Sequence, residues 1–313
     1  MRKYDRYAVF NIAVKGILFV AVLLICFCLV RSLTDISAAF SLLISAIPGL
    51  TAVLLFSCLL RYTRIYYGYY SFLSGFLFGS KEGKVYCPCC GKHFDKFVDE
   101  RYYADEKHYD PATFSGSRQD VICDCCRSAP RHRIIASWAE DNAGQLKESK
   151  ILYFAPELSM MIWFKRHKIR VVTADLYDRR ADKKLDITST GLPSGSEDVV
   201  FCNHVLEHVS DYSVALSELN RIIRKGGMLI ISFPVDEDLD ETREDKTASE
   251  EERRRLFGQY DHLRLFGKDC RKILENAGFE VGAIDISGMP EEIVPVNGPS
   301  NYDTNMIFRC VKK

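Results

Sequence analysis

The feature that most constrains the fold is the alternation of short apolar runs with longer amphipathic stretches after residue 150. Five apolar runs have the length of buried strands, at residues 151–155, 171–174, 199–202, 228–233 and 306–310. Three stretches have helical spacing, at residues 158–167, 214–224 and 268–277. This alternation predicts an α/β domain with a doubly wound, mostly parallel sheet, whose ligand site lies at the carboxyl ends of the strands.

Polar residues follow several of these expected strands. Asp175 comes directly after the second run, where a carboxylate can accept hydrogen bonds from both hydroxyls of a ribose. Asp186 follows further along, where it could accept a hydrogen bond from an adenine amino group. Acids at strand ends are also ordinary caps of the turns that follow them, so both interpretations stay open.

One stretch carries a family resemblance. It is Asp-Val-Val-Phe-Cys-Asn-His-Val-Leu-Glu-His-Val at 198–209, followed by Leu-Asn-Arg-Ile-Ile-Arg-Lys-Gly-Gly at 219–227. About residues 150–313 resemble the class I S-adenosylmethionine-dependent methyltransferases, particularly the type 11 group, and we place the whole domain at 134–313. The resemblance implies a Rossmann-like fold, S-adenosylmethionine as cofactor and transfer of its methyl group to an acceptor, leaving S-adenosylhomocysteine.

The resemblance also implies which residues would bind the cofactor. We expect the ribose at Asp175, the adenine at Asp186 and Ile187, and the methionine moiety beside Asn203 and His204. The loop after the first strand completes the expected set with Phe154, Ala155, Pro156 and Glu157. This loop departs from the family pattern because it has no glycine; Ala155 is small enough for some approach, and Glu157 could meet the methionine ammonium group.

Candidates for the chemistry are three histidines, His204, His208 and His262. His204, Glu207 and His208 have the i, i+3, i+4 spacing that could hold a divalent metal if the turn is helical. The alternative is that one histidine lines the cofactor and the others pack or cap. We expect the charged residues 236–255 to form a mobile, solvated lid, with His262 closing over the site as a general base.

Two Cys-x-x-Cys pairs precede this domain, and their spacing predicts a closed, structural Zn²⁺ site made by Cys87, Cys90, Cys123 and Cys126. The middle cysteines, Cys89 and Cys125, leave the choice of ligands ambiguous, and His93, His108 and His132 are further candidates. A redox dithiol or a disulfide is the rival interpretation. Residues 123–133 and 257–267 resemble a methyltransferase subgroup with an N-terminal zinc ribbon, and we assign residues 81–133 to a zinc-ribbon-like subdomain.

Two uncharged apolar runs lie near the N-terminus, and they predict a membrane anchor over residues 1–80. We expect transmembrane helices at about 10–30 and 36–60 and an interfacial aromatic segment at 61–80. A signal peptide, a buried helical hairpin and, for 61–80, a core helix are the alternatives. Basic residues flank the pair, which predicts a multi-pass protein of the cell (inner) membrane with both termini and the catalytic domain in the cytoplasm.

The charge balance bears on partners. Lysine plus arginine and aspartate plus glutamate both number 42, so the chain has no strong positive field and nucleic acid is not an expected partner. These features together predict a membrane-anchored methyltransferase that contacts the lipid bilayer and acts on a lipid-linked, glycan or small-molecule acceptor. The alternative is a noncatalytic membrane-tethered scaffold with a degenerate methyltransferase fold and a partner-binding zinc ribbon.

Overall fold

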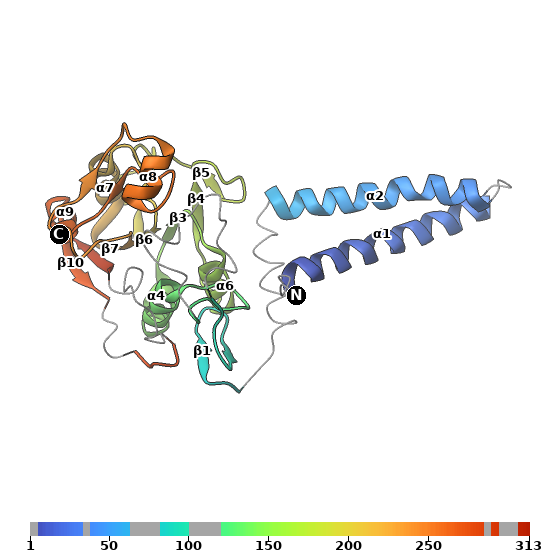
Figure 1. Ribbon diagram of the computed structural model, residues 1–313, viewed down its shortest axis with the longest axis horizontal. Helices are drawn as coiled ribbons and strands as arrows, with labels where there is room; N and C mark the ends of the chain where they lie inside the picture. Colours follow the sequence, from blue (N-terminus) through green and yellow to red (C-terminus); the bar gives the residue numbers. More distant parts are fainter. Residues whose placement is uncertain (1–5, 34–37, 63–81, 100–119, 285–288, 294–305) are drawn as a thin grey trace. The chain divides into compact units, whose positions relative to one another are not determined.

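The structure is a computed structural model of the 313-residue chain, and it describes residues 6–33, 38–62, 82–99, 120–284, 289–293 and 306–313. The chain divides into two compact units, Met1–Tyr69 and Tyr70–Lys313 (Figure 1). We describe each unit by itself.

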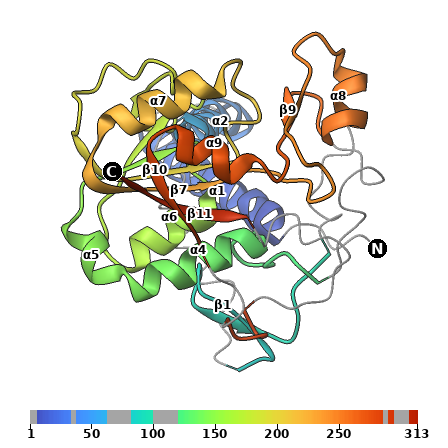
Figure 2. The same ribbon diagram turned by 90° about the vertical axis from the view of Figure 1, so that its left-hand side faces the viewer.

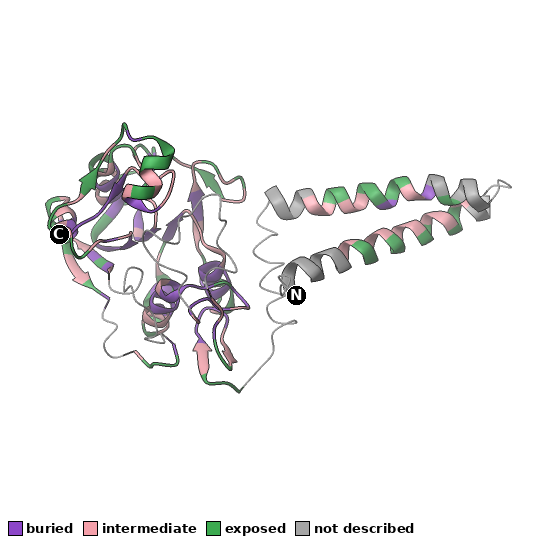
Figure 3. Ribbon diagram, viewed as in Figure 1, coloured by how far each residue is buried: buried purple, intermediate pink, exposed green. Residues whose placement is uncertain are grey.

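The first unit contains two helices that pack against each other, α1 (Arg6–Leu33) and α2 (Ala38–Tyr62). They approach closely at Gly49, where a Cβ atom would lie 2.9 Å from Cδ2 of Phe19. Parts of both helices are exposed (Figure 3). The exposed residues include the apolar Ile17 and Ile47.

The prediction of a membrane anchor is corrected here. A spanning helix needs about 20 consecutive, predominantly apolar residues. Among the residues that the structure describes, no helix combines the length and the apolar character needed to cross a membrane. The predicted transmembrane helices and the multi-pass localisation are therefore not supported, and the expected interfacial segment lies almost wholly outside the described residues.

The second unit is built on a seven-stranded sheet with the order β10-β11-β7-β6-β3-β4-β5. Its strands are β3 (Ile151–Phe154), β4 (Val172–Asp175), β5 (Lys183–Lys184), β6 (Glu197–Asn203), β7 (Ile223–Ser232), β10 (Phe279–Ala283) and β11 (Ile307–Lys312). The five strands from β7 to β5 are parallel, whereas β11 is antiparallel to both of its neighbours. The predicted Rossmann-like, mostly parallel sheet is confirmed.

Helices cover both faces of this sheet (Figure 2). One face carries α7 (Tyr212–Ile222) and α9 (Cys270–Asn276), and the other carries α4 (Pro130–Asp141), α5 (Ala143–Glu148) and α6 (Leu158–Arg166). Alternate side chains of β3 pack on opposite faces of the sheet. Phe154 belongs to the α7–α9 cluster, whereas the Tyr153 ring lies 6.2 Å from Phe164 of α6.

The junction between α7 and β7 differs from the prediction. We expected a helix to residue 224 and a strand from residue 228, but α7 ends at Ile222 and β7 begins at the next residue. Gly226, with φ of 70°, and Gly227 lie inside β7, where the pairing with β6 shifts register. A Cβ atom on Gly227 would lie 2.8 Å from the Asp198 carbonyl oxygen, so the two strands approach too closely for a side chain.

The expected lid contains regular structure. Strand β8 (Arg243–Glu244) pairs with β9 (Arg264–Leu265), and α8 (Glu250–Phe257) follows β8. A capping box between Ser249 and Glu252 begins α8, and Gly258 with φ of 83° ends it. Half of the residues of α8 are exposed and only Phe257 is buried, in line with the solvated surface that the charge pattern predicted.

Candidate functional site

The order of the strands locates the candidate site. The chain runs from β3 outward to β4 and β5, and then returns to place β6 on the other side of β3. In open parallel sheets, ligands bind outside the carboxyl ends of the strands at such a reversal. Ala155, Asp175 and His204 stand at or directly after the carboxyl ends of β3, β4 and β6.

Ala155 has a left-handed backbone conformation of the kind that glycine adopts most readily. Its φ is 48°, in the left-handed region, and its N–H donates to the Ala174 carbonyl oxygen at 2.9 Å. A non-glycine residue held in this region costs about 1–2 kcal/mol. The close-approach geometry of the loop is therefore present with a methyl side chain, which fits the cofactor.

The two acids at the ends of β4 and β5 each cap their own turn. Asp175 Oδ1 accepts from the N–H groups of Tyr177 and Asp178 at 2.7 and 2.8 Å. Asp186 Oδ1 accepts from the N–H and hydroxyl of Thr188, and these hydrogen bonds lower the pKa of Asp186. Within the described chain, the hydrogen bonds of both carboxylates involve Oδ1, so Oδ2 of each is left for a ligand.

Asn203 ends β6 and carries a buried donor. Its Oδ1 accepts from the Ser232 hydroxyl at 3.0 Å, which fixes the amide orientation. Its Nδ2 is buried and has no hydrogen-bond partner among the described residues. A buried polar group without a partner costs about 1–3 kcal/mol, so an acceptor on a bound ligand would remove this penalty.

Glu157, at the start of α6, is already surrounded by partners. Its Oε1 lies 2.9 Å from Arg131 and 2.5 Å from Nε2 of His132, and its Oε2 accepts from the Tyr153 hydroxyl at 3.2 Å. Burial alone would raise the pKa of Glu157, but the hydrogen bond from His132 and the charge of Arg131 hold it well below its usual range. The expected contact with the methionine ammonium group stays a prediction, and the ligand would have to share this carboxylate.

His132 binds Glu157 as a neutral ring. Its Nδ1 accepts from the Ala129 N–H at 2.9 Å, so Nε2 carries the proton and donates to Glu157. Burial lowers the pKa of His132, in agreement with this tautomer. Neither Arg131 nor His132 was expected at the strand-end site; the only sequence signal was the Arg-His-Arg run after the second cysteine pair.

The three histidines expected to act in chemistry lie around one carboxylate, that of Glu207. Nδ1 of His204 is 3.3 Å from Oε1 of Glu207, and the rings of His208 and His262 stack edge to face at 4.8 Å. Burial alone would raise the pKa of Glu207, whereas the three imidazoles lower it to about 2. His204, with φ of 51°, is held by its N–H bond to the Ser232 carbonyl oxygen at 2.8 Å.

A buried arginine that the sequence did not reveal holds this loop in place. Arg264 Nη1 donates to the carbonyl oxygens of Leu206 and Val209, and its Nε donates to Glu244 at 3.0 Å. The N–H of Leu263 donates to the Glu207 carbonyl oxygen at 2.8 Å. These bonds explain why the segment around His262, far along the chain, packs on the His204–His208 turn.

The cysteine pairs come together as the spacing predicted. The Sγ atoms of Cys87, Cys90, Cys123 and Cys126 all lie within 4.8 Å of one another, and all four side chains are buried. The Cys87–Cys126 and Cys90–Cys123 separations are 3.6 and 3.8 Å. Tetrahedral zinc with bonds of about 2.3 Å places its sulfurs about 3.8 Å apart, whereas a disulfide needs about 2.05 Å. The residues fit zinc and not a disulfide.

The other ligand candidates have different positions. The Cys89 thiol donates to the His132 carbonyl oxygen at 3.4 Å, Cys125 is buried outside the four-sulfur group, and the His93 ring packs on Tyr86 at 4.8 Å. His108 lies outside the described residues. The structure therefore groups the sulfurs of the outer pairs and leaves Cys89 and Cys125 outside that group.

Two arginines attach this Cys-rich segment to the sheet domain. Arg133 of α4 is fully buried and donates to the carbonyl oxygens of Val121, Ser128 and Ile293. Arg166 of α6 donates to the Pro88 carbonyl oxygen at 2.8 Å. The Cys-rich segment and the loop that carries Glu157 are therefore parts of one packed structure.

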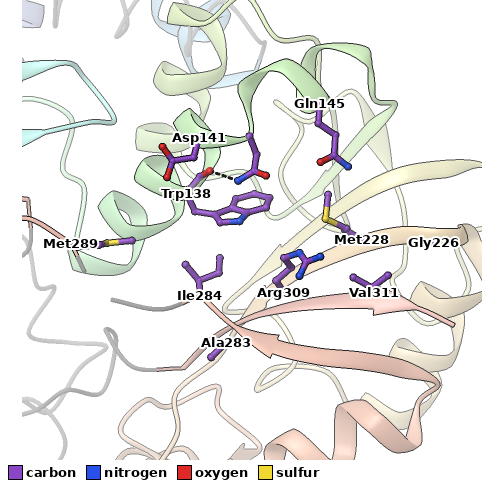
Figure 4. Close-up of a pocket in the computed structure, with 11 residues that line it drawn as sticks. Trp138, Asp141, Gln145, Gly226, Met228, Ala283, Ile284, Met289, Arg309 and Val311 are labelled. Carbon is purple, nitrogen blue, oxygen red and sulfur yellow. Dashed lines mark hydrogen bonds between the residues drawn. The ribbon is translucent and has the colours of Figure 1, made fainter. Parts of the chain in front are cut away.

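A cavity of about 480 Å³ lies at the other end of the strands (Figure 4). Trp138 of α4, Met228 directly after the register shift between β7 and β6, and Arg309 of β11 line it. Since β7 is parallel to β3, this position is near the amino ends of the parallel strands and apart from the acids described above.

One family model and one curated protein match parts of the chain. Residues 161–231 match the family model described as a methyltransferase domain. A curated protein, an uncharacterized 37.1 kDa transposon protein of Streptomyces fradiae, is 29% identical over 99 residues, which span 32% of this chain and only 29% of that protein.

Solved structures are similar at lower identity. A SAM-dependent methyltransferase of Thermotoga maritima, described as a possible histamine N-methyltransferase, is 20% identical, with a TM-score of 0.37 over 58% of this chain and 92% of its own. SAM-dependent methyltransferases of Archaeoglobus fulgidus and Mesorhizobium loti are 16% and 14% identical, with TM-scores of 0.37 and 0.38. They cover 58% and 56% of this chain, and 94% and 96% of their own.

Proposed function

We propose that this protein is an S-adenosylmethionine-dependent methyltransferase. The observation that carries the proposal is the set of groups at the carboxyl ends of β3, β4 and β6. Ala155 has the left-handed backbone of a close-approach loop, Asp175 keeps one carboxylate oxygen for a ligand, and Asn203 has a buried donor without a partner in the described chain. The matched family segment, residues 161–231, spans β4 and β6.

The cofactor would supply a methyl group on a sulfonium, which is transferred by direct displacement. The residues of the chain would act by binding and orienting. Asp175 Oδ2 would accept a ribose hydroxyl, Asp186 Oδ2 would accept from the adenine, and Asn203 Nδ2 would donate to the methionine moiety. Positioning of this kind can supply much of the rate of a displacement between two bound groups. The acceptor class, a lipid-linked molecule, a glycan or a small molecule, stays open.

We also propose one structural zinc ion per chain, bound by Cys87, Cys90, Cys123 and Cys126. The sulfur separations support it, and a site with four thiolates leaves no open position for chemistry. Its part in function would be to hold α4, and with it Arg131 and His132, against Glu157.

A noncatalytic scaffold is the second candidate. Glu157 supports it, because Arg131, His132 and Tyr153 already occupy the carboxylate that could otherwise meet the cofactor. A degenerate domain of this kind would keep the fold and lose the affinity for S-adenosylmethionine.

Calorimetric titration with S-adenosylmethionine distinguishes the two candidates. We expect the full chain to bind it, and Asp175→Asn to weaken binding at least tenfold, since a charge-assisted hydrogen bond is worth about 1.5–3 kcal/mol. Asparagine retains the oxygen that caps the turn and replaces the one left for the ribose. Asp178→Asn is the control, because Arg180 already holds that carboxylate. No binding by the wild-type chain would favour the scaffold, whereas equal affinity of folded Asp175→Asn would contradict the ribose role of Asp175.

A further inference from the structure

The environment of Glu207 calls for a partner that the described residues do not supply. Its side chain is fully buried, and neither carboxylate oxygen has a hydrogen bond in the described part of the chain. His204 lies at ion-pair distance but without hydrogen-bond geometry. A buried carboxylate in such surroundings is normally paired with a cation or coordinated to a metal.

His262 is oriented in the manner of a metal ligand. Its ring is buried, and its Nδ1 lies 2.9 Å from the Phe257 carbonyl oxygen. A carbonyl oxygen can only accept, so Nδ1 carries the proton and Nε2 presents its lone pair. Metal-binding histidines almost always donate their other ring N–H to a carbonyl or a carboxylate in this way.

His208 repeats the arrangement with a carboxylate. Its Nδ1 lies 3.3 Å from Oδ2 of Asp261, which leaves Nε2 as the second lone pair. The two rings come from segments far apart in the sequence and meet edge to face at 4.8 Å. One third of the His208 side chain is exposed, so the group opens to solvent on one side.

The distances agree with one ion between the three side chains. The ligand atoms of Glu207, His208 and His262 all lie within 4.8 Å of one another. Ligands at about 2.0–2.2 Å from a common metal lie roughly 3–4 Å apart, which small side-chain rotations achieve. We propose that Glu207, His208 and His262 form a binding site for a divalent transition-metal ion, with coordination positions left open.

This site differs in chemistry from the four-cysteine site. Thiolates select zinc, whereas two imidazoles and one carboxylate also accept Mn²⁺ and Fe²⁺. The spacing in the sequence suggested His204 as a third ligand, but the structure replaces it with His262 and leaves His204 beside Oε1 of Glu207.

The position of the site bears on the acceptor, and this step rests on the proposed function. Glu207 and His208 follow Asn203 by four and five residues, next to the proposed methionine position. An ion there with open positions would bind an oxygen-bearing acceptor, such as one with a hydroxyl group and a neighbouring oxygen. The binding of the metal itself does not depend on this step.

Titration with Mn²⁺ alone tests the proposal. The full chain is first loaded with one equivalent of zinc, and free Mn²⁺ is then followed by electron paramagnetic resonance. We expect one bound Mn²⁺ per chain, weakened at least a hundredfold in Glu207→Gln and His208→Gln. Asp261→Asn, which alters the partner of His208 and no ligand, should weaken binding 10- to 100-fold.

The control is His167→Gln, because His167 stacks on Trp163 and belongs to neither metal group. Its Mn²⁺ binding should equal that of the wild type. No Mn²⁺ binding by the wild type, or equal binding by folded Glu207→Gln, would overturn the site. Should Glu207→Gln not fold, the partly exposed His208 gives the deciding variant. Mn²⁺ binding without S-adenosylmethionine binding would support the metal site and contradict the proposed function.

Discussion

Two carboxylates follow neighbouring strands of the sheet, Glu157 half-buried and Glu207 fully buried, and their surroundings are opposite. Glu157, after β3, is bound by an arginine, a histidine and a tyrosine, and two of these come from the helix that follows the cysteine pairs. Glu207, after β6, is surrounded by histidines yet makes no hydrogen bond within the described chain. The hydrogen bonds of Glu157 are supplied by the protein, whereas those of Glu207 are left for a bound ligand.

The comparison distinguishes a carboxylate that stabilises the fold, Glu157, from one that is available to a ligand, Glu207, at the same edge of the sheet. A carboxylate with its charge and hydrogen bonds satisfied stabilises the fold and gains little from a ligand. A buried carboxylate without hydrogen bonds lowers stability until a ligand arrives, which is typical of functional sites. Three predictions test this difference.

The largest effect on stability is expected from the zinc site. This site supports the region around Glu157 and not the region around Glu207. Cys123→Ser should reduce the zinc content by one ion per chain and unfold the Cys-rich segment, since a structural zinc ion supplies about 10–16 kcal/mol of apparent binding energy to small zinc domains. Elemental analysis and limited proteolysis measure both changes. Mn²⁺ binding at Glu207 should be retained in Cys123→Ser.

Cys89→Ser is the matched control for this prediction. The Cys89 thiol donates to the His132 carbonyl oxygen and is outside the four-sulfur group, and a serine hydroxyl can make the same bond. Its zinc content should equal that of the wild type. Loss of zinc in Cys89→Ser and not in Cys123→Ser would contradict the ligand assignment.

The second prediction compares the same substitution at the two carboxylates. Glu157→Gln should lower the free energy of unfolding by about 2–3 kcal/mol, because it removes the charge that holds Arg131 and His132. Glu207→Gln in metal-free protein should change it by less than about 1 kcal/mol, since no hydrogen bond is lost. Denaturant unfolding at about pH 8.5, where ordinary histidines are neutral, measures both values. Equal losses would remove the distinction.

The smallest effect concerns Ala155, in the loop that carries Glu157. Ala155→Gly should raise the free energy of unfolding by up to about 1 kcal/mol, because relief of the left-handed strain exceeds the entropy cost of glycine. Ala136→Gly, inside α4, is the control and should lower it by about 1 kcal/mol or more. Thermal melts of the two variants give opposite shifts if the backbone at residue 155 is strained.

The sequence predicted the sheet well, because strand–helix alternation is a local pattern that the parallel sheet must repeat. It also predicted the four cysteines, since two short turns determine which sulfurs can meet. The prediction of membrane helices was wrong. It rested on runs of uncharged residues, and no described helix meets the requirement for a membrane span.

The residues that surround Glu157 and Glu207 could not be predicted from local sequence patterns. Arg131 and His132 lie 25 or more residues before Glu157, and His262 lies far after Glu207, so only the folded chain brings each group together. Arg264 illustrates the limit most clearly. Within a charged stretch it resembles any solvated arginine, yet it is fully buried and bonded to the turn it supports.

The position of Arg264 has a consequence for how the protein is made. Its bonds to Leu206 and Val209 close loops of 58 and 55 residues, and the chain emerges from the ribosome N-terminus first. Strands β3 to β7 can therefore assemble while the His204–His208 turn is still unsupported, and the turn gains its final shape only after residue 264 has been synthesised. A nascent chain would carry the strand-end acids before it could hold the second metal, so the metal site matures last.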